Sequence, residues 1–316
     1  MEYLLLVVGF VLLIKGADIF VDGASKIARK IGIPSIIVGL TIVSIGTSAP
    51  ELAVSVISAV DGNSGIAIGN VLGSNMFNTL IVLGLTSVIS PIVFKKSTVK
   101  RDYIVNLLSV ILLYILSFGF TISDGKLTRI DGIILLLLCL IYMIILVRVV
   151  MRGNNSKEEA DKSINIFTNI IISIIGIVGI VIGGDMVVDN ATIIATSLGM
   201  SEKLVGLTIV AMGTSLPELV TSVVAALKGE KEIALGNVLG SNIFNVLLII
   251  GSSATISPFI VQGSLAIDFI ILIISTIFVG GLIFLNKKKM KKITRVEGAI
   301  LLAIYVGYLI YIIMRN

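Results

Sequence analysis

The stretch GTSAPELAVSVISAV (residues 46–60) recurs with few changes as GTSLPELVTSVVAAL (residues 213–227), and each copy sets a proline and a glutamate within an apolar run. Sliding the sequence against itself by 167 residues, from position 46 to position 213, aligns the two copies without a gap. The same shift aligns Asn78 with Asn245. Two halves this similar are predicted to fold alike.

The composition around these stretches is that of a membrane protein, with 56% hydrophobic residues, 14% charged residues and a mean hydropathy of +1.12. Apolar runs of about 18 to 25 residues are long enough to cross about 30 Å of hydrocarbon as helices. We expect ten such spans, near residues 3–21, 35–60, 66–90, 103–120, 130–150, 166–188, 203–227, 233–256, 265–285 and 298–314.

Basic residues gather in alternate loops, because most of the 24 Lys and Arg follow an odd-numbered predicted span. By the positive-inside rule, this bias places both termini outside a multi-pass protein of the plasma membrane. The alternation also supports the count of ten, since one missed helix would move later loops to the wrong side. The residues that lie on the opposite side are Lys126, Arg129, Lys203 and Arg315.

The repeat predicts the architecture. Five spans in each half is an odd number, so the second half must enter the membrane from the opposite side. The predicted fold is therefore an all-α polytopic membrane protein with ten transmembrane helices in two inverted five-helix repeats. We expect repeats at residues 1–151 and 164–316, joined by a cytoplasmic linker at 152–163. Such repeats place binding sites near the bilayer midplane, where interrupted helices supply ligands.

The prolines predict where the helices are interrupted. Pro50 has no N–H to give to the carbonyl of Gly46, so the backbone must open there, and Pro217 repeats the argument. The carbonyls of residues 44–47 and 211–214 then become candidate ligands. Free carbonyls at membrane depth are tolerated only when they are buried in protein or face a hydrated cavity.

Polar side chains follow each glutamate along the predicted helices. Ser48, Glu51 and Ser55 share one helical stripe, and polar residues recur every fourth position in the next span. Asn70 begins this second series in the first half, and Asn237 begins it in the second half. Each of these asparagines could either ligate an ion or pack between helices, and both interpretations are open. The second series is Asn70, Ser74 and Asn78, and the counterparts in the other half are Ser215, Glu218, Ser222, Asn237, Ser241 and Asn245.

The two glutamates require a partner. A carboxylate near the membrane centre costs about 2.5–3.5 kcal/mol on insertion scales, and neither Glu51 nor Glu218 has a Lys or Arg on its stripe. A bound cation is the simplest partner, and a set of carboxylate, hydroxyl, amide and carbonyl oxygens suits Ca²⁺. Nitrogen and sulfur ligands are absent from the stripes, which disfavours transition metals.

Other residues are expected to be structural. The chain has no histidine, which excludes HExxH zinc sites and serine–histidine triads. Its single cysteine, Cys139, lies within a span and is expected to pack there. The acids near span ends are expected to be solvated, and these are Asp18, Asp22, Asp185 and Asp189.

GTSAPE with GNVLGSNMFN (69–78), and GTSLPE with GNVLGSNIFN (236–245), resemble the paired alpha-repeats of the cation/calcium exchanger superfamily, most closely its prokaryotic sodium/calcium exchangers. The resemblance covers both halves. It implies an antiporter, not an enzyme, that exchanges Na⁺ for Ca²⁺ by alternating access at a mid-membrane site. It also implies no cofactor, no nucleic acid and no obligatory protein partner, with both ions bound as substrates within the lipid bilayer.

The resemblance also implies the residues of the site. Calcium would bind to Glu51 and Glu218 with backbone oxygens of Thr47 and Thr214. Some relatives carry aspartate where this chain has Asn245, potassium-dependent exchangers among them, which argues against potassium co-transport. Proton/calcium exchange and a passive cation channel stay open as alternatives. The further residues implied for sodium are Ser48, Ser74, Ser215 and Ser241, the carbonyls of Ser44 and Ala211, and, near the centre, Asn78 and Asn245.

Overall fold

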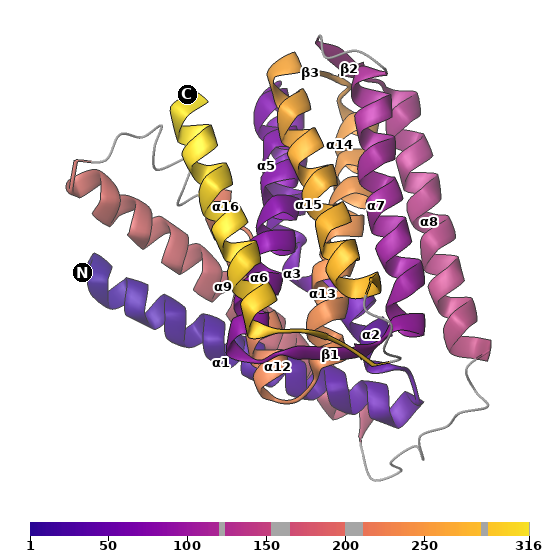
Figure 1. Cartoon of the computed structure of the whole chain (residues 1–316). Helices are drawn as coiled ribbons and strands as arrows, with labels where there is room; N and C mark the ends of the chain where they lie inside the picture. Colours follow the sequence, from indigo (N-terminus) through magenta and orange to yellow (C-terminus); the bar gives the residue numbers. More distant parts are fainter. Residues whose placement is uncertain (120–123, 153–164, 200–210, 286–289, 316) are drawn as a thin grey trace.

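The computed structural model describes residues 1–119, 124–152, 165–199, 211–285 and 290–315, which are mostly helical (Figure 1). The helices of the first half are α1 (Glu2–Ile31), α2 (Ser35–Val38), η1 (Gly39–Val43), α3 (Ser44–Thr47), α4 (Ala49–Val60), α5 (Ser64–Phe77), η2 (Asn78–Val82), α6 (Leu83–Ile89), α7 (Lys96–Phe118) and α8 (Arg129–Arg152). Those of the second half are α9 (Ile166–Ser197), α11 (Ala211–Gly213), α12 (Leu216–Leu227), α13 (Lys231–Phe244), η5 (Asn245–Ile250), α14 (Gly251–Ile256), η6 (Gly263–Leu265), α15 (Ala266–Phe284) and α16 (Arg295–Arg315).

Eight helices in the described residues are long and apolar enough to cross a membrane, which makes the chain an integral multi-pass membrane protein. A ninth span is reached if Ser35–Thr47 and Ala49–Val60, bent by 49° relative to each other, are counted as one. The span predicted at 203–227 falls partly outside the described residues. Its described part includes α12, whose 12 residues are too few to cross alone.

The helices α1 and α9 are longer than predicted, at 30 and 32 residues. The predicted ends, at residues 21 and 188, follow the acids that interrupt the apolar runs. Both helices continue past these acids, because Asp18 and Asp22 are one turn apart on a single face and do not break the helical backbone.

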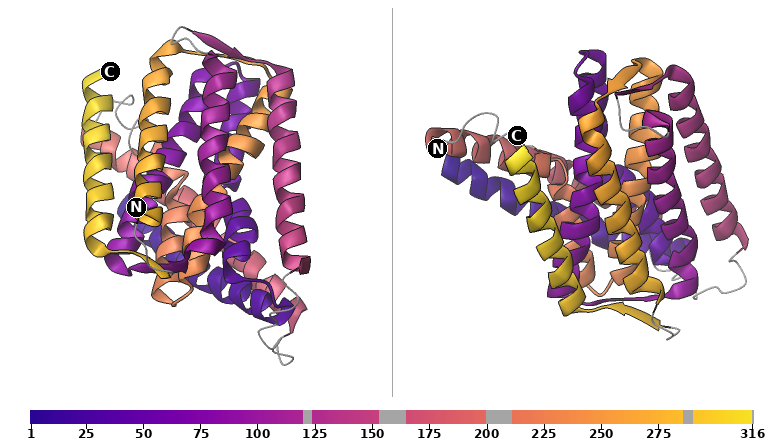
Figure 2. Two further views of the ribbon diagram at one scale, coloured as in Figure 1. Left: turned by 45° about the vertical axis from the view of Figure 1, so that its right-hand side comes forward. Right: turned by 45° about the horizontal axis from the view of Figure 1, so that its top comes forward.

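The helices α1 and α9 lie side by side, antiparallel, at the edge of the bundle (Figure 1 and the right-hand view of Figure 2). Glycines let their backbones approach closely, as in other membrane helix pairs. A Cβ built on Gly16 would lie 2.7 Å from the nitrogen of Ile180 and 2.8 Å from the oxygen of Gly176. Position 16 therefore has no room for a side chain.

Gly16→Val is expected to lower the melting temperature of the detergent-purified protein, because α1 and α9 must separate to admit the side chain. Overpacking of this kind costs about 1–3 kcal/mol of unfolding free energy. The control is Gly307→Ala on α16, where no described atom lies within 4 Å of a new Cβ. Equal melting temperatures for the two variants would contradict the close packing of α1 on α9.

Two short antiparallel sheets lie at opposite ends of the bundle (Figure 1). At one end β1 (Ile92–Lys95) pairs with β4 (Met290–Ile293), and at the other β2 (Gly125–Leu127) pairs with β3 (Phe259–Val261). The all-α prediction misses these strands, because each pairs with a segment more than a hundred residues away. We call the two ends of the molecule the β1–β4 end and the β2–β3 end.

Two buried aspartates have matched partners in the two halves. Asp102, on α7, pairs with Arg101 at 2.8 Å and accepts a hydrogen bond from Tyr142 at 3.1 Å. From the sequence this arginine resembles any loop charge, whereas here it neutralises a carboxylate with no exposed side-chain surface. In the second half, Asp268 likewise accepts from Tyr308 at 3.2 Å, but its arginine, Arg315 at 2.8 Å, comes from the end of α16 and not from the neighbouring position.

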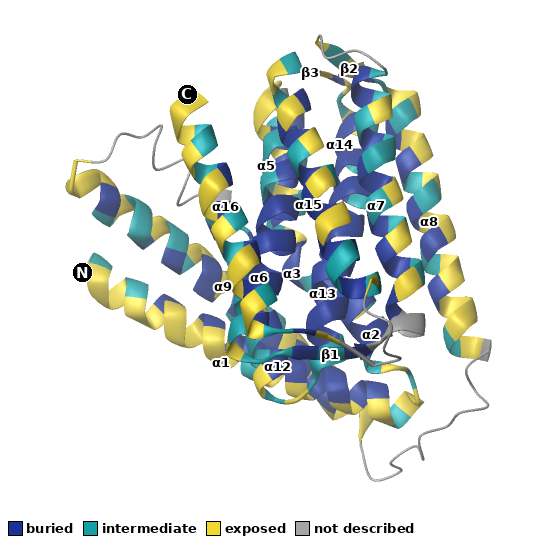
Figure 3. Ribbon diagram, viewed as in Figure 1, coloured by how far each residue is buried: buried dark blue, intermediate teal, exposed yellow. Residues whose placement is uncertain are grey.

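The core of the molecule surrounds α5 and α13 (Figure 3). The segment α13–η5–α14 is almost wholly buried, whereas α1, α8 and α9 expose large apolar side chains on their outer faces. Exposed apolar faces of this kind are suited to lipid. The proline–glutamate stretches α4 and α12 pack against the two central helices.

Candidate cation site

The site begins at the breaks that the prolines predict. α3 ends at Thr47, Ser48 leaves the helical conformation with φ −84° and ψ 10°, and α4 starts at Ala49. Pro50 lies in the first turn of α4, where a proline is tolerated because its missing N–H has no helical partner. The predicted opening of the backbone is confirmed, and Ser215 repeats it with φ −94° and ψ 5°.

The break does not release every carbonyl that the sequence analysis expects. The carbonyl of Ser44 still accepts the N–H of Ser48 at 2.9 Å, so the break leaves this hydrogen bond in place, and the role of the carbonyl as a ligand stays a prediction. The Ser44 hydroxyl also donates to the carbonyl of Gly39, at 2.6 Å. Ala211 is the first residue described after the gap and begins α11.

Glu51 and Glu218 lie in the first turns of α4 and α12, and neither has any exposed surface. Each accepts a hydrogen bond from a serine of the other half. Ser215 Oγ donates to Glu51 Oε1 at 2.9 Å, and Ser48 Oγ donates to Glu218 Oε1 at 2.7 Å. The two stretches that open the sequence are therefore interleaved in space.

A second serine approaches each carboxylate from the neighbouring central helix. Ser74 Oγ lies 3.5 Å from Glu51 Oε1, and Ser241 Oγ lies 3.3 Å from Glu218 Oε1. Each second serine is also within hydrogen-bond distance of the first, at 2.9 Å for Ser215 to Ser74 and 3.1 Å in the counterpart pair. Each glutamate thus has two buried hydroxyls around one oxygen.

The second oxygen of each carboxylate has no partner. Oε2 of Glu51 and Oε2 of Glu218 are buried and make no hydrogen bond within the described residues. Burying a carboxylate oxygen without a partner costs free energy that a bound cation would recover. No group of three or more His, Cys, Asp or Glu able to hold a metal occurs in the part of the chain that is described.

Asn237 stabilises this arrangement through hydrogen bonds to both halves. Its Nδ2 donates to Ser222 Oγ at 3.0 Å and to the carbonyl of Glu218 at 3.4 Å, and its Oδ1 accepts from Thr47 Oγ1 at 3.3 Å. Both its amide nitrogen and its amide oxygen are hydrogen-bonded within the protein, which favours the packing role that the sequence left open. The counterpart contacts join Asn70 to Ser55, Glu51 and Thr214 at 3.0–3.3 Å.

Asn78 and Asn245 begin the π-helical turns η2 and η5 and are fully buried. Both side-chain atoms of Asn78, and Oδ1 of Asn245, are without a partner among the described residues. π-helical turns within α-helices occur frequently at functional sites. Neither asparagine is hydrogen-bonded to a glutamate of the site in the described structure.

Two asparagines that the sequence analysis passed over link the central helices. Asn75 donates to the carbonyl of Asn242 at 3.2 Å and accepts from Asn245 Nδ2 at 3.0 Å. Asn242 Nδ2 donates to Thr79 Oγ1 at 2.9 Å. Asn75 and Asn242 occupy the same position of the repeated GSN motif, and this recurrence could have identified them from the sequence.

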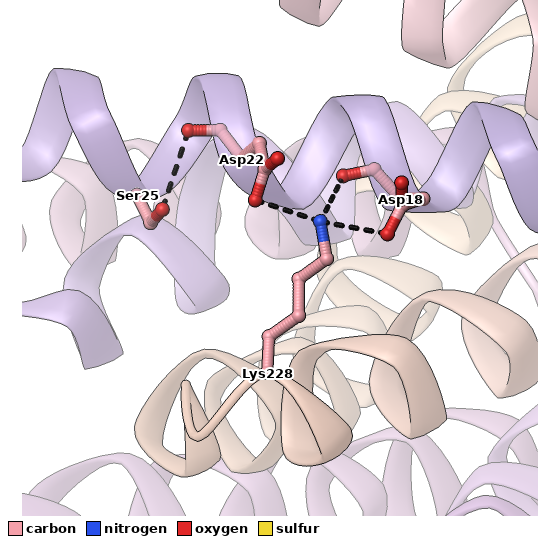
Figure 4. Close-up of polar contacts among 4 residues, drawn as sticks. All are labelled: Asp18, Asp22, Ser25 and Lys228. Carbon is pink, nitrogen blue, oxygen red and sulfur yellow. Dashed lines mark hydrogen bonds and ion pairs between the residues drawn. The ribbon is translucent and has the colours of Figure 1, made fainter.

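Asp18 and Asp22 remain 45% and 51% exposed, so the prediction that they are solvated is confirmed, but both also form an ion pair that the sequence does not predict. Lys228, the residue that follows α12, reaches both carboxylates on α1 (Figure 4). This contact joins the two halves across 206 and 210 residues of chain. Asp185 and Asp189 are exposed, as predicted.

A multi-pass helical bundle with two buried, hydroxyl-lined carboxylates at its core is typical of a membrane transporter of cations. The chain matches the family model described as sodium/calcium exchanger protein over residues 1–148 and 168–314. It belongs to this family of cation/calcium exchangers, which are transporters, and the resemblance is confirmed.

Individual relatives extend over nearly the whole chain. The sodium/calcium exchanger MaX1 of Methanosarcina acetivorans is 33% identical over 350 residues, covering 98% of this chain and 97% of its own. The inner membrane protein YrbG of Escherichia coli is 38% identical over 263 residues, covering 80% of this chain and 79% of its own. A solved structure of the sodium-calcium exchanger NCX_Mj, soaked with zero Na⁺ and Ca²⁺, superposes with a TM-score of 0.83 at 31% identity and covers 98% of each chain.

Proposed function

We propose that this protein is a sodium/calcium antiporter that exchanges Na⁺ for Ca²⁺ by alternating access at the site around Glu51 and Glu218. The observation that carries the proposal is the matched pair of fully buried carboxylates, each with one oxygen bound to hydroxyls and one oxygen that has no partner among the described residues. An all-oxygen set of this kind suits hard cations such as Ca²⁺. The similarity to MaX1, which is named a sodium/calcium exchanger, supports the choice of ions.

The ions themselves would use overlapping ligands. In this proposal Ca²⁺ binds to both glutamates and to the backbone oxygens of Thr47 and Thr214. Sodium ions replace it and share the same carboxylates, so the two kinds of ion compete, and competition enforces exchange. An empty site would leave two bare carboxylates, which are costly to occlude, so return without a substrate is suppressed. The proposed sodium ligands are Ser48, Ser74, Ser215, Ser241, Asn78 and Asn245, with the carbonyls of Ser44 and Ala211.

We also propose that residues 1–151 and 164–316 are inverted repeats of five helices each, joined by the linker at 152–163. The matched contacts of the two glutamates with serines, of Asp102 and Asp268 with tyrosines, and of the two sheets support this relationship. The loop charges favour a cytoplasmic β1–β4 end and extracellular termini in the plasma membrane. Access to the site would alternate as α1 and α9, which pack closely together, slide across the remaining helices.

Proteoliposomes with separately imposed gradients test the choice of ions. Calcium uptake is expected when sodium is loaded inside and to be absent when only a proton or a potassium gradient is imposed. Uptake driven by the proton gradient would instead indicate a proton/calcium exchanger. Uptake that ignores all three gradients would indicate a passive channel, and either result would contradict the proposal.

A further inference from the structure

Lys228 makes a three-point contact with α1 (Figure 4). Its Nζ lies 2.8 Å from Asp18 Oδ1, 2.6 Å from the Asp18 carbonyl oxygen and 2.7 Å from Asp22 Oδ1. An ammonium group has three N–H donors, so the contact uses its full donor capacity. Burial lowers the pKa of Lys228, but the two aspartates outweigh this and raise its pKa above the ordinary value, so the lysine stays charged.

This contact lies at the β1–β4 end of the molecule. Ser90, which stands just before β1, donates a hydrogen bond to the carbonyl of Ala226 at 3.3 Å, two residues before Lys228. α1 also packs along α12, the helix that carries Glu218. The lysine therefore joins the long helix α1 to a helix of the cation site, at one end only.

The equivalent position in the other half has the opposite charge. The shift of 167 residues places Asp61 opposite Lys228 in the alignment, and Asp185 and Asp189 opposite the two acids of α1. Three acids cannot form this ion pair. In the described residues, α9 and α4 also lack the extended packing that joins α1 to α12. The two halves therefore differ in side-chain charge at the same position where they differ in helix packing.

We propose that Lys228, Asp18 and Asp22 form a one-sided latch, which holds α1 on α12 and favours the conformation in which the cation site is closed at the β1–β4 end. The inference rests on the proposed alternating access. Movement of α1 along α12 must break the latch, and the acids at the β2–β3 end supply no compensating pair. The latch therefore shifts the equilibrium between the two conformations toward the one in which its ion pairs are intact.

The expected shift is moderate. The side chain of Lys228 is 23% exposed and those of the two aspartates are 45% and 51% exposed, so solvent screens the ion pairs. Loss of the latch should change the ratio of the two conformations by about three- to tenfold. The ratio of apparent Ca²⁺ dissociation constants at the two faces should change by the same factor, because each constant scales inversely with the population of the competent conformation.

Lys228→Met tests the latch in vesicles sorted by orientation, with half-saturation by Ca²⁺ measured at each face. The variant is expected to bind Ca²⁺ more tightly from the β1–β4 face and more weakly from the β2–β3 face. The matched control, Lys231→Met, removes a positive charge three residues away and should keep the wild-type ratio. A general folding defect would lower transport from both faces and leave this ratio unchanged.

Asp61→Lys provides the converse test. It places a lysine at the position equivalent to Lys228 in the other half, whose corresponding acids are Asp185 and Asp189. The ratio of the apparent Ca²⁺ dissociation constants at the two faces is expected to change in the direction opposite to that caused by Lys228→Met. An unchanged ratio in either variant, or a shift in the same direction in both, would overturn the latch.

Hydrogen exchange of the purified protein separates the latch from the proposed function. Lys228→Met should raise deuterium uptake in residues 18–31 and 222–228, whether or not the protein transports calcium. A wild-type protein without sodium-driven uptake would contradict the proposed function alone. Unchanged exchange in these segments would contradict the latch alone.

Discussion

Vesicles that carry Glu51→Gln are expected to show no sodium-driven calcium uptake above that of protein-free vesicles. Glutamine keeps the size of the side chain and an oxygen that can accept from Ser215, but it removes the negative charge. Even changes outside the direct ligands of a metal cost about 10- to 100-fold in affinity, so the loss of a charged ligand should cost on the order of 100-fold or more.

The matched arrangement of Glu218 predicts the same result for Glu218→Gln. The control is Glu230→Gln, which neutralises an acid at the start of α13, outside the site. Its uptake should resemble that of the wild type. Sodium-driven uptake at the wild-type rate in either site variant would show that the carboxylate charge is not required for exchange.

Arg101→Met is expected to destabilise the protein by about 3–5 kcal/mol, because it leaves a buried carboxylate without its counter-charge. Asp102 has no exposed side-chain surface, and its remaining partner would be the hydroxyl of Tyr142. Chemical unfolding in detergent micelles measures the effect. Since Arg101, Asp102 and Tyr142 are not among the proposed ligands, any protein that remains folded should still bind Ca²⁺.

Lys100→Met serves as the control for this effect, because it removes an exposed charge from the adjacent position. It should leave the unfolding free energy nearly unchanged. The double variant Arg101→Met/Asp102→Asn should recover part of the lost stability, since it removes the uncompensated charge. A destabilisation no larger than that of Lys100→Met would mean that the pair contributes nothing to folding.

Features carried by local sequence could be predicted here. The apolar runs identify the membrane class, Pro50 predicts the break beside Ser48, and the shift of 167 residues pairs Glu51 with Glu218. The first two follow from the chemistry of one short segment, and the third follows from comparing two segments of the same sequence. Burial of both glutamates was also predictable, because a charged side chain in an apolar run must face the protein interior or water.

Features that depend on packing between distant segments could not be predicted. The partners of Lys228 lie more than 200 residues away, and the alignment of the halves places an acid at the equivalent position. Arg101 resembles any loop arginine until the burial of Asp102 is known. The strand pairs could not be predicted for the same reason, because each strand is a short segment whose partner comes from a remote loop.

The most direct test of the central claim is the position of a bound calcium ion in a crystal soaked with Ca²⁺, located by its anomalous scattering. The account predicts one ion within about 2.3–2.6 Å of an oxygen of both Glu51 and Glu218, with added Na⁺ abolishing the peak. A calcium ion bound elsewhere in the bundle, with both carboxylates uninvolved, would contradict it.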